Sequence, residues 1–117
     1  MNIQIFGTTK CFETKKAERY FKERGIKYQF IDILRYPMSL GEFRNIKAAA
    51  GGIEPLINTK AKEYDILFIR YLASEAAKEE KLFENQGLFN TPVVRNGRKV
   101  TIGYKPEVWG LWEKEEN

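Results

Sequence analysis

The sequence predicts a single α/β domain whose mixed β-sheet is interrupted by a helical insertion. A strand–helix–strand pattern fills residues 2–33, and an Asn-Gly hairpin signal lies within residues 91–102. Between them the chain shows helix signals and no clear strand signal. A chain of 117 residues with 43% hydrophobic content is long enough for one hydrophobic core. We therefore expect residues 1–36 and 88–117 to form the core of this domain and residues 38–87, approximately, to form the insert.

The first 33 residues predict two parallel strands joined by a helix. Residues 2–6 alternate polar and apolar side chains, which is typical of a strand. Residues 12–24 place apolar side chains on one helical face and charged ones on the other, and Gly25 provides a stop. Residues 26–33 are rich in β-branched and aromatic residues, which predicts a second strand. A strand–helix–strand unit of this size implies parallel pairing.

The middle of the chain contains several helix-start signals. Ser39-Leu40-Gly41-Glu42 matches a capping box and predicts a helix over residues 40–50. Thr59 is expected to cap a short turn that runs to Tyr64. Ser74 is expected to cap a helix over residues 75–86 that stops at Gly87.

The C-terminal part predicts a hairpin followed by a helix. Asn96-Gly97 lies between two β-like runs and favours a type I′ turn, which needs positive φ at both central residues. Pro106 suits the first position of a closing helix. This helix is expected to dock on the sheet through Val108, Trp109, Leu111 and Trp112.

Cys11, the only cysteine, falls between the first strand and the first helix. Unpaired N–H groups and the helix dipole favour a thiolate at such a position. Lys10, Lys15 and Lys16 add positive charge, whereas Glu13 opposes them. A free cysteine has a pKa of about 8.5, and surroundings of this kind lower it. The alternative is a buried structural cysteine, but the polar residues on both sides of Cys11 favour a reactive thiol.

Composition excludes several classes of site and partner. The chain has no histidine and one cysteine, which excludes zinc sites, Cys-His or Ser-His catalysis, and an internal disulfide. Its net charge of +4 is spread over the sequence, so we expect a solvated surface and no direct nucleic-acid binding. Neither a signal peptide nor a membrane-spanning stretch is recognisable, and we expect a cytoplasmic protein.

Five segments in this order resemble the arsenate reductase (ArsC) and Spx family: "IFGTTKC", "TKKAERYFKERGI", "YQFIDI", "PLINTKAKEY" and "NTPVVRNGRKVTIGY". The resemblance covers nearly the whole chain. It implies a thioredoxin-like, glutaredoxin-like mixed sheet with a helical insertion, which agrees with the element order above.

The resemblance also implies roles for single residues. Cys11 takes the place of the catalytic nucleophile, and Lys15 falls where the family often has a basic residue. Together with Lys10, Thr91 and Pro92, Lys15 is expected to contact the substrate. Pro92 matches a proline that these folds hold in the cis form, although trans is favoured by ~0.5–1 kcal/mol at X–Pro bonds. Without the resemblance, an ordinary trans proline at the start of a strand would be expected.

This sequence departs from the family pattern at three positions. Thr91 and Asn58 stand where arsenate reductases carry arginines, and Thr14 stands where Spx proteins often have a second cysteine. An oxyanion calls for bidentate guanidinium donors, so these changes argue against arsenate reduction. They also exclude an internal dithiol switch.

We therefore predict a thiol-dependent oxidoreductase that uses the Cys11 thiolate. It would hold no bound cofactor or metal and would be reduced by an external thiol, such as glutathione with glutaredoxin or an equivalent. The alternatives are an Spx-like regulatory protein that binds RNA polymerase or another protein partner, and a scaffold without thiol chemistry.

Overall fold

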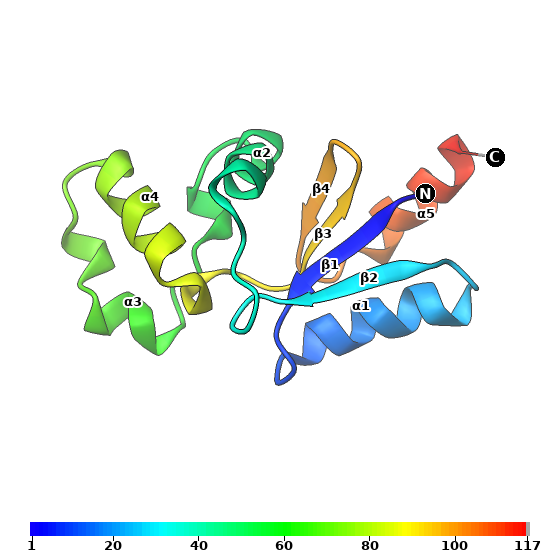
Figure 1. Ribbon diagram of the computed structural model, residues 1–117, viewed down its shortest axis with the longest axis horizontal. Coiled ribbons are helices and arrows are strands. Elements are labelled where there is room, and N and C mark those ends of the chain that lie inside the picture. Colours follow the sequence, from blue (N-terminus) through cyan, green and yellow to red (C-terminus); the bar gives the residue numbers. More distant parts are fainter. Residues whose placement is uncertain (117) are drawn as a thin grey trace. The chain divides into compact units, whose positions relative to one another are not determined.

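A computed structural model describes residues 1–116 of the protein (Figure 1). Its strands are β1 (Ile3–Gly7), β2 (Tyr28–Asp32), β3 (Val93–Asn96) and β4 (Lys99–Ile102). Its α-helices are α1 (Phe12–Glu23), α2 (Leu40–Ala50), α3 (Lys62–Ile66), α4 (Glu75–Glu84) and α5 (Pro106–Glu115). Three short 3₁₀ turns, η1 (Glu54–Leu56), η2 (Ile69–Tyr71) and η3 (Gln86–Leu88), lie among the helices of the middle part. The predicted α/β class is confirmed.

The described chain consists of two compact units. The first contains Met1–Asp32 together with the chain from Thr91 onward, and it holds the whole sheet. The second, Ile33–Asn90, is helical apart from an isolated bridge between Ile57 and Phe89. Within the described residues, no helix is long and apolar enough to cross a membrane.

The sheet has the strand order β2-β1-β3-β4. β1 and β2 are parallel, with Ile3 opposite Tyr28, whereas β3 is antiparallel to both β1 and β4. α1 connects the parallel pair and runs alongside it (Figure 1). This is the thioredoxin-like mixed sheet that the sequence predicts.

The β3–β4 hairpin is present, but its predicted turn is wrong by one position. Asn96 pairs with Lys99 within the ladder, so the two turn residues are Gly97 and Arg98. Gly97 alone has a positive φ, of 61°, and a glycine at the first turn position is typical of type II′. Asn96 stays in the strand because its buried side chain accepts a hydrogen bond from the Asn2 backbone N–H at 3.2 Å.

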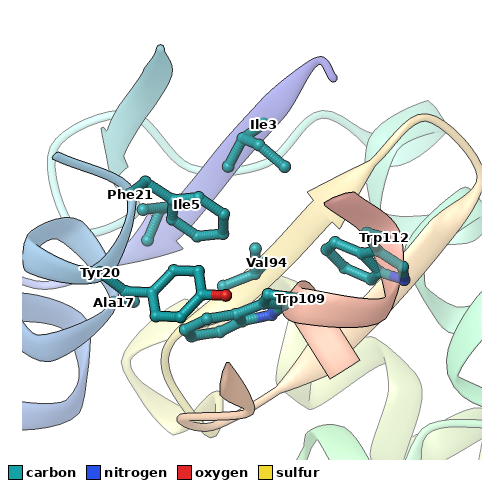
Figure 2. Packing of buried hydrophobic residues seen from close by; sticks show 8 residues of the cluster. All are labelled: Ile3, Ile5, Ala17, Tyr20, Phe21, Val94, Trp109 and Trp112. Atoms are coloured by element: carbon teal, nitrogen blue, oxygen red, sulfur yellow. The ribbon is translucent and has the colours of Figure 1, made fainter. Parts of the chain in front are cut away.

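The core of the first unit lies where α1 and α5 meet the sheet. Figure 2 shows its side chains converging from these two helices and from β1 and β3: Ile3, Ile5, Ala17, Tyr20, Phe21, Val94, Trp109 and Trp112. The Tyr20 and Trp109 rings meet edge to face at 5.1 Å. Trp109 also donates a hydrogen bond from Nε1 to the Thr101 Oγ1 at 2.8 Å, which satisfies the polar atom of a buried ring.

Leu111 does not dock on the sheet, contrary to the prediction. Its side chain is 55% exposed, whereas Trp109 and Trp112 are buried. Successive helical residues are rotated by about 100°, so Leu111 points about 200° away from Trp109. A fourth apolar residue in such a short segment therefore faces solvent.

The second unit has the predicted α2 helix. The Ser39 hydroxyl accepts from the Glu42 N–H, and the Glu42 carboxylate accepts from the Ser39 N–H, which forms the capping box. Gln86 then ties the start of α2 to η3, because its side chain bonds both the N–H and the C=O of Met38. The Phe43 ring packs edge to face on Phe83 and Phe89 in the core.

Two details of this unit differ from the prediction. Thr59 caps no helix, because the Asn58 side chain instead accepts from the Lys60 N–H at 3.0 Å and organises that turn. Ser74 caps α4 as predicted, by accepting from the Ala77 N–H. The helix nevertheless ends at Glu84, since Asn85 leaves the helical region at φ −130°, and Gly87 lies inside η3.

Candidate functional site

Cys11 occupies the N-cap position of the 12-residue helix α1. Its backbone is extended, at φ −83° and ψ 119°, and its C=O accepts the first helical hydrogen bond, from the Lys15 N–H at 3.2 Å. Its own N–H donates to the Thr8 C=O, which closes the turn between β1 and the helix. The side chain is partly exposed, so the sulfur lies at the positive end of a helix and within reach of a substrate.

The Thr91–Pro92 segment lies next to this sulfur. The Cys11 thiol donates a hydrogen bond to the Thr91 C=O, with 3.6 Å between sulfur and oxygen. The Thr91–Pro92 peptide bond is cis, which confirms the prediction made from the family resemblance. The Pro92 C=O accepts from the Gly103 N–H at 2.8 Å, so the segment after β4 is tied to the same loop.

The pKa of Cys11 is lowered from its ordinary value by hydrogen bonds. Burial is the largest influence and raises the pKa, because it disfavours the charged form. The hydroxyls of Thr14 and Thr91, and then the backbone N–H groups of Thr14 and Glu13, bond the thiolate and together outweigh burial. Thr91 acts in both directions, since its C=O accepts from the thiol while its hydroxyl favours the thiolate.

Thr14 is a site residue that sequence reasoning missed. It is 1% exposed, and its Oγ1 has no hydrogen-bond partner among the described residues while Cys11 is a thiol. Ionisation of Cys11 supplies the acceptor that this buried hydroxyl lacks. The available signal was the three-residue spacing, which puts Thr14 on the same side of the helix as Cys11.

Gly7 allows Thr14 to lie this close to the sheet. A Cβ at Gly7 would be 2.4 Å from the Thr14 Oγ1 and 2.5 Å from its Cγ2. Real Cβ atoms do not approach side chains so closely. The end of β1 and the first turn of α1 therefore pack directly on each other, and the Thr14 side chain lies against Gly7.

The lysines near Cys11 in the sequence are exposed, and none of them is among the groups that shift the pKa of Cys11. Lys10 and Lys15 are exposed, and Lys16 lies over the Tyr104 ring at 5.7 Å from its centre. The lowering of the Cys11 pKa is due to the hydrogen bonds above and not to these charges. Contacts of Lys10 and Lys15 with a substrate remain predictions.

Asn58 has a structural role in the second unit. Its N–H donates to the Leu88 C=O at 2.8 Å, and its side chain accepts from the Lys60 N–H. Asn90 bonds the same segment through the Pro55 and Ile57 carbonyls. Asn58 therefore holds a loop together.

The described residues contain no group of three or more His, Cys, Asp or Glu side chains that could hold a metal ion.

Comparison with known proteins agrees with this geometry. Residues 6–111 match the sequence profile of the ArsC family. The chain belongs to the ArsC family. Its match with the global transcriptional regulator Spx 2 of Oceanobacillus iheyensis is 28% identical and covers 89% of this chain and 78% of that protein.

Solved structures show the same fold. A solution structure of a Staphylococcus aureus protein is 30% identical, with a TM-score of 0.76, and the match covers 93% of this chain and 96% of that one. An arsenate reductase from Vibrio cholerae is 22% identical with a TM-score of 0.82, over 92% of this chain and 94% of that one. At this identity the latter shows the fold alone.

Proposed function

We propose that this ArsC-family protein is a monothiol oxidoreductase in which Cys11 is the nucleophile and an external thiol is the reductant. The observation that carries the proposal is the surroundings of one sulfur atom. Cys11 is partly exposed at a helix N-cap, beside a cis Thr91–Pro92 bond, and hydrogen bonds lower its pKa. A thiolate favoured in this way is the nucleophile that thiol–disulfide exchange requires.

The proposed reaction consists of two exchanges. The Cys11 thiolate attacks the glutathione sulfur of a mixed disulfide R–S–S–G, and the leaving thiolate R–S⁻ takes up a proton. A second glutathione thiolate then attacks the glutathione sulfur held on Cys11, which releases oxidised glutathione and restores the Cys11 thiolate. In sum, R–S–S–G and one glutathione give R–SH and one glutathione disulfide. The backbone of Thr91 beside Pro92 and the side chains of Lys10, Lys15 and Thr91 would hold the substrate.

A disulfide suits these residues better than an arsenate ion. Recognition of a small oxyanion rests on paired guanidinium donors, and Thr91 and Asn58 provide none at the two positions where arsenate reductases carry arginines. Disulfide exchange needs no such donors, because the charge stays on sulfur. A reducing cytoplasm, which supplies the external thiol, is the compartment in which this reaction would run.

The test is to incubate the protein with cysteine–glutathione mixed disulfide and to follow both the adduct on Cys11 and the turnover of the disulfide. The wild type should gain one glutathione on Cys11 and turn over when free glutathione is added. Cys11→Ser should do neither, while Thr9→Ser, which changes an exposed neighbour, should behave like the wild type. Reaction of wild-type Cys11 no faster than that of a model peptide thiol would refute the proposal.

A second candidate is regulation by binding to a protein partner such as RNA polymerase. It is favoured by the match with proteins named as the global transcriptional regulator Spx. It is also favoured by three exposed apolar side chains in the helical unit, Ile66, Phe68 and Tyr71, which are 65%, 66% and 77% exposed. Phe68 has a left-handed backbone, at φ 53°, which is uncommon for an aromatic residue.

Capture of purified RNA polymerase distinguishes the two candidates. A regulator should bind it equally well with Cys11→Ser and lose binding with a Phe68→Gly/Tyr71→Ser variant, in which glycine suits the left-handed backbone. Absence of binding by the wild type would remove this candidate and leave the oxidoreductase.

A further inference from the structure

We propose that a groove beside α1 binds the carboxylate-bearing part of a low-molecular-weight peptide thiol whose sulfur reacts at Cys11. This inference rests on the proposed oxidoreductase function and adds the place where the carboxylate of the thiol binds. The groove, of about 360 Å³, lies between α1 and the segment that leads from β4 into α5. Its walls include Lys16, Arg19, Glu23, Arg24 and the rings of Tyr20 and Tyr104.

The charges in this groove favour an anion. Three cations face one carboxylate, that of Glu23. Arg24 is already engaged, since it lies 3.7 Å from the Glu113 carboxylate and stacks on the Tyr20 ring. Lys16 and Arg19 form no ion pair within the described residues and are exposed. These two cations are therefore available to a ligand carboxylate.

The groove has an apolar floor as well as a charged rim. Lys16 lies over the Tyr104 ring, whose side chain is 37% exposed. The Tyr20 ring is buried, and its hydroxyl is held by the Glu113 carboxylate at 2.9 Å. A ligand with methylene groups between its charged ends can bury them on the exposed ring while its carboxylates reach the lysine and arginine.

The groove and the Cys11 sulfur lie in the same unit and share the helix α1. At 1.5 Å per residue, Lys16 and Arg19 lie about 7.5 and 12 Å along the helix axis from Cys11. Tyr104 follows Gly103, whose N–H is bonded to the Pro92 C=O beside the sulfur. An extended tripeptide spans about 10 Å. A thiol of tripeptide size can thus place its sulfur at Cys11 and a terminal carboxylate between Lys16 and Arg19.

Glu13 narrows the class of ligand. The Glu13 carboxylate lies close to Gly103, because a Cβ built on Gly103 would be 3.6 Å from the Glu13 Oε2. Glu13 also precedes Lys16 by about one helical turn. A carboxylate between the sulfur and the cations repels a purely anionic thiol and attracts an ammonium group. The groove therefore suits a zwitterionic peptide thiol, such as glutathione, better than an uncharged or wholly anionic one.

Binding of S-methylglutathione tests this inference, because its thioether cannot exchange with Cys11. Titrated into the full-length protein and followed by NMR, it should shift the amide signals of Lys16, Arg19 and Tyr104. The Lys16→Glu/Arg19→Glu variant should bind it at least roughly tenfold more weakly, the size expected for losing a charged hydrogen bond. Lys22→Glu/Lys27→Glu, at two exposed lysines that do not line the groove, makes the same change of charge and should bind like the wild type.

A second probe separates carboxylate recognition from general attraction. The diethyl ester of S-methylglutathione keeps the peptide but loses both carboxylates, and it should bind at least roughly tenfold more weakly. The proposed carboxylate site in the groove would be overturned if the ester bound as tightly as S-methylglutathione, or if the Lys16→Glu/Arg19→Glu variant bound S-methylglutathione as tightly as the wild type. Carboxylate-dependent binding combined with an unreactive Cys11 would instead support the groove and contradict the proposed reaction.

Discussion

At the scale of single residues, the site depends on a buried hydroxyl without a partner. A buried donor left unbonded costs about 1–3 kcal/mol. The Thr14 Oγ1 carries this cost while Cys11 is protonated and loses it when the thiolate forms. The unbonded hydroxyl therefore destabilises the folded protein with a Cys11 thiol relative to the folded protein with a Cys11 thiolate. The sequence alone could not predict this, because burial of Thr14 depends on how β1 and α1 pack.

Replacement of Thr14 by valine should change reactivity and stability in opposite directions. Valine keeps the shape and removes the hydroxyl, so the pKa of Cys11 should rise and alkylation by iodoacetamide at pH 7 should slow severalfold. At a pH low enough to keep Cys11 a thiol, the free energy of unfolding should increase by about 1 kcal/mol, because an unbonded polar group is gone. The pH dependence of alkylation and urea unfolding measure the two effects. Thr14→Ser, which keeps the hydroxyl, is the matched control, and an unchanged pKa in Thr14→Val would contradict the role of Thr14.

The lowered pKa of Cys11 also predicts a pH dependence of stability. The folded state favours the thiolate, so its contribution is complete above the pKa of the unfolded chain, about 8.5, and is lost as pH falls through the lower folded value. The difference in unfolding free energy between wild type and Cys11→Ser should therefore rise with pH across this window. Urea unfolding of both proteins from pH 5 to pH 9.5 measures it. A difference that stays flat or falls would show that the folded protein does not favour the thiolate.

At the scale of elements, local signals predicted where helices and strands begin better than they predicted register. The Ser39 capping box and the Ser74 cap act within one turn, and both are present. The hairpin register depends on Asn96 bonding Asn2, 94 residues away in sequence, which no local pattern reveals. The Asn58 turn was missed because Asn58 and Thr59 both suit such positions, and the choice between them follows from the bond of Asn58 to Leu88.

The contact between β1 and α1 predicts a strong coupling between Gly7 and Thr14. Gly7→Ala alone should destabilise the protein by about 1–3 kcal/mol, because its new Cβ overlaps the Thr14 side chain. Thr14→Ala removes both overlapping atoms, so the double variant should be more stable than the sum of the single effects by about 1 kcal/mol or more. Urea unfolding at pH 6 gives all four values. Simple additivity would show that the two elements do not meet as closely as described.

At the scale of the whole molecule, the order of elements predicted the fold, and the single cysteine predicted where the candidate site lies. Strand–helix–strand, helical middle, hairpin and closing helix specify the mixed sheet, and the resemblance added the cis Thr91–Pro92 bond, which the structure contains. The groove was not predicted. It combines α1 with Tyr104, which lies about 85 residues further along the chain, and only the folded sheet brings them together.

The overall charge of the molecule gives a last prediction about Cys11. Twenty Lys and Arg against 16 Asp and Glu make the protein basic, with a pI of about 9.2. Such a field attracts anions over distances of about 30 Å at 0.01 M salt but only about 10 Å at 0.1 M. Iodoacetate, an anion, should therefore alkylate Cys11 severalfold more slowly at 0.1 M than at 0.01 M salt, whereas neutral iodoacetamide should be nearly insensitive.

The two reagents share the same chemistry at sulfur, so the ratio of their rates isolates the electrostatic effect from changes in thiolate population. The groove cations lie on the same helix as Cys11, and Lys16→Glu/Arg19→Glu should reduce the salt dependence for iodoacetate more than Lys22→Glu/Lys27→Glu does, although both variants make the same change of charge. A ratio of rates that does not change with salt in the wild type would mean that Glu13 and the neighbouring carboxylates cancel the positive field at the sulfur. The protein would then distinguish substrates by their charge only through direct contacts in the groove.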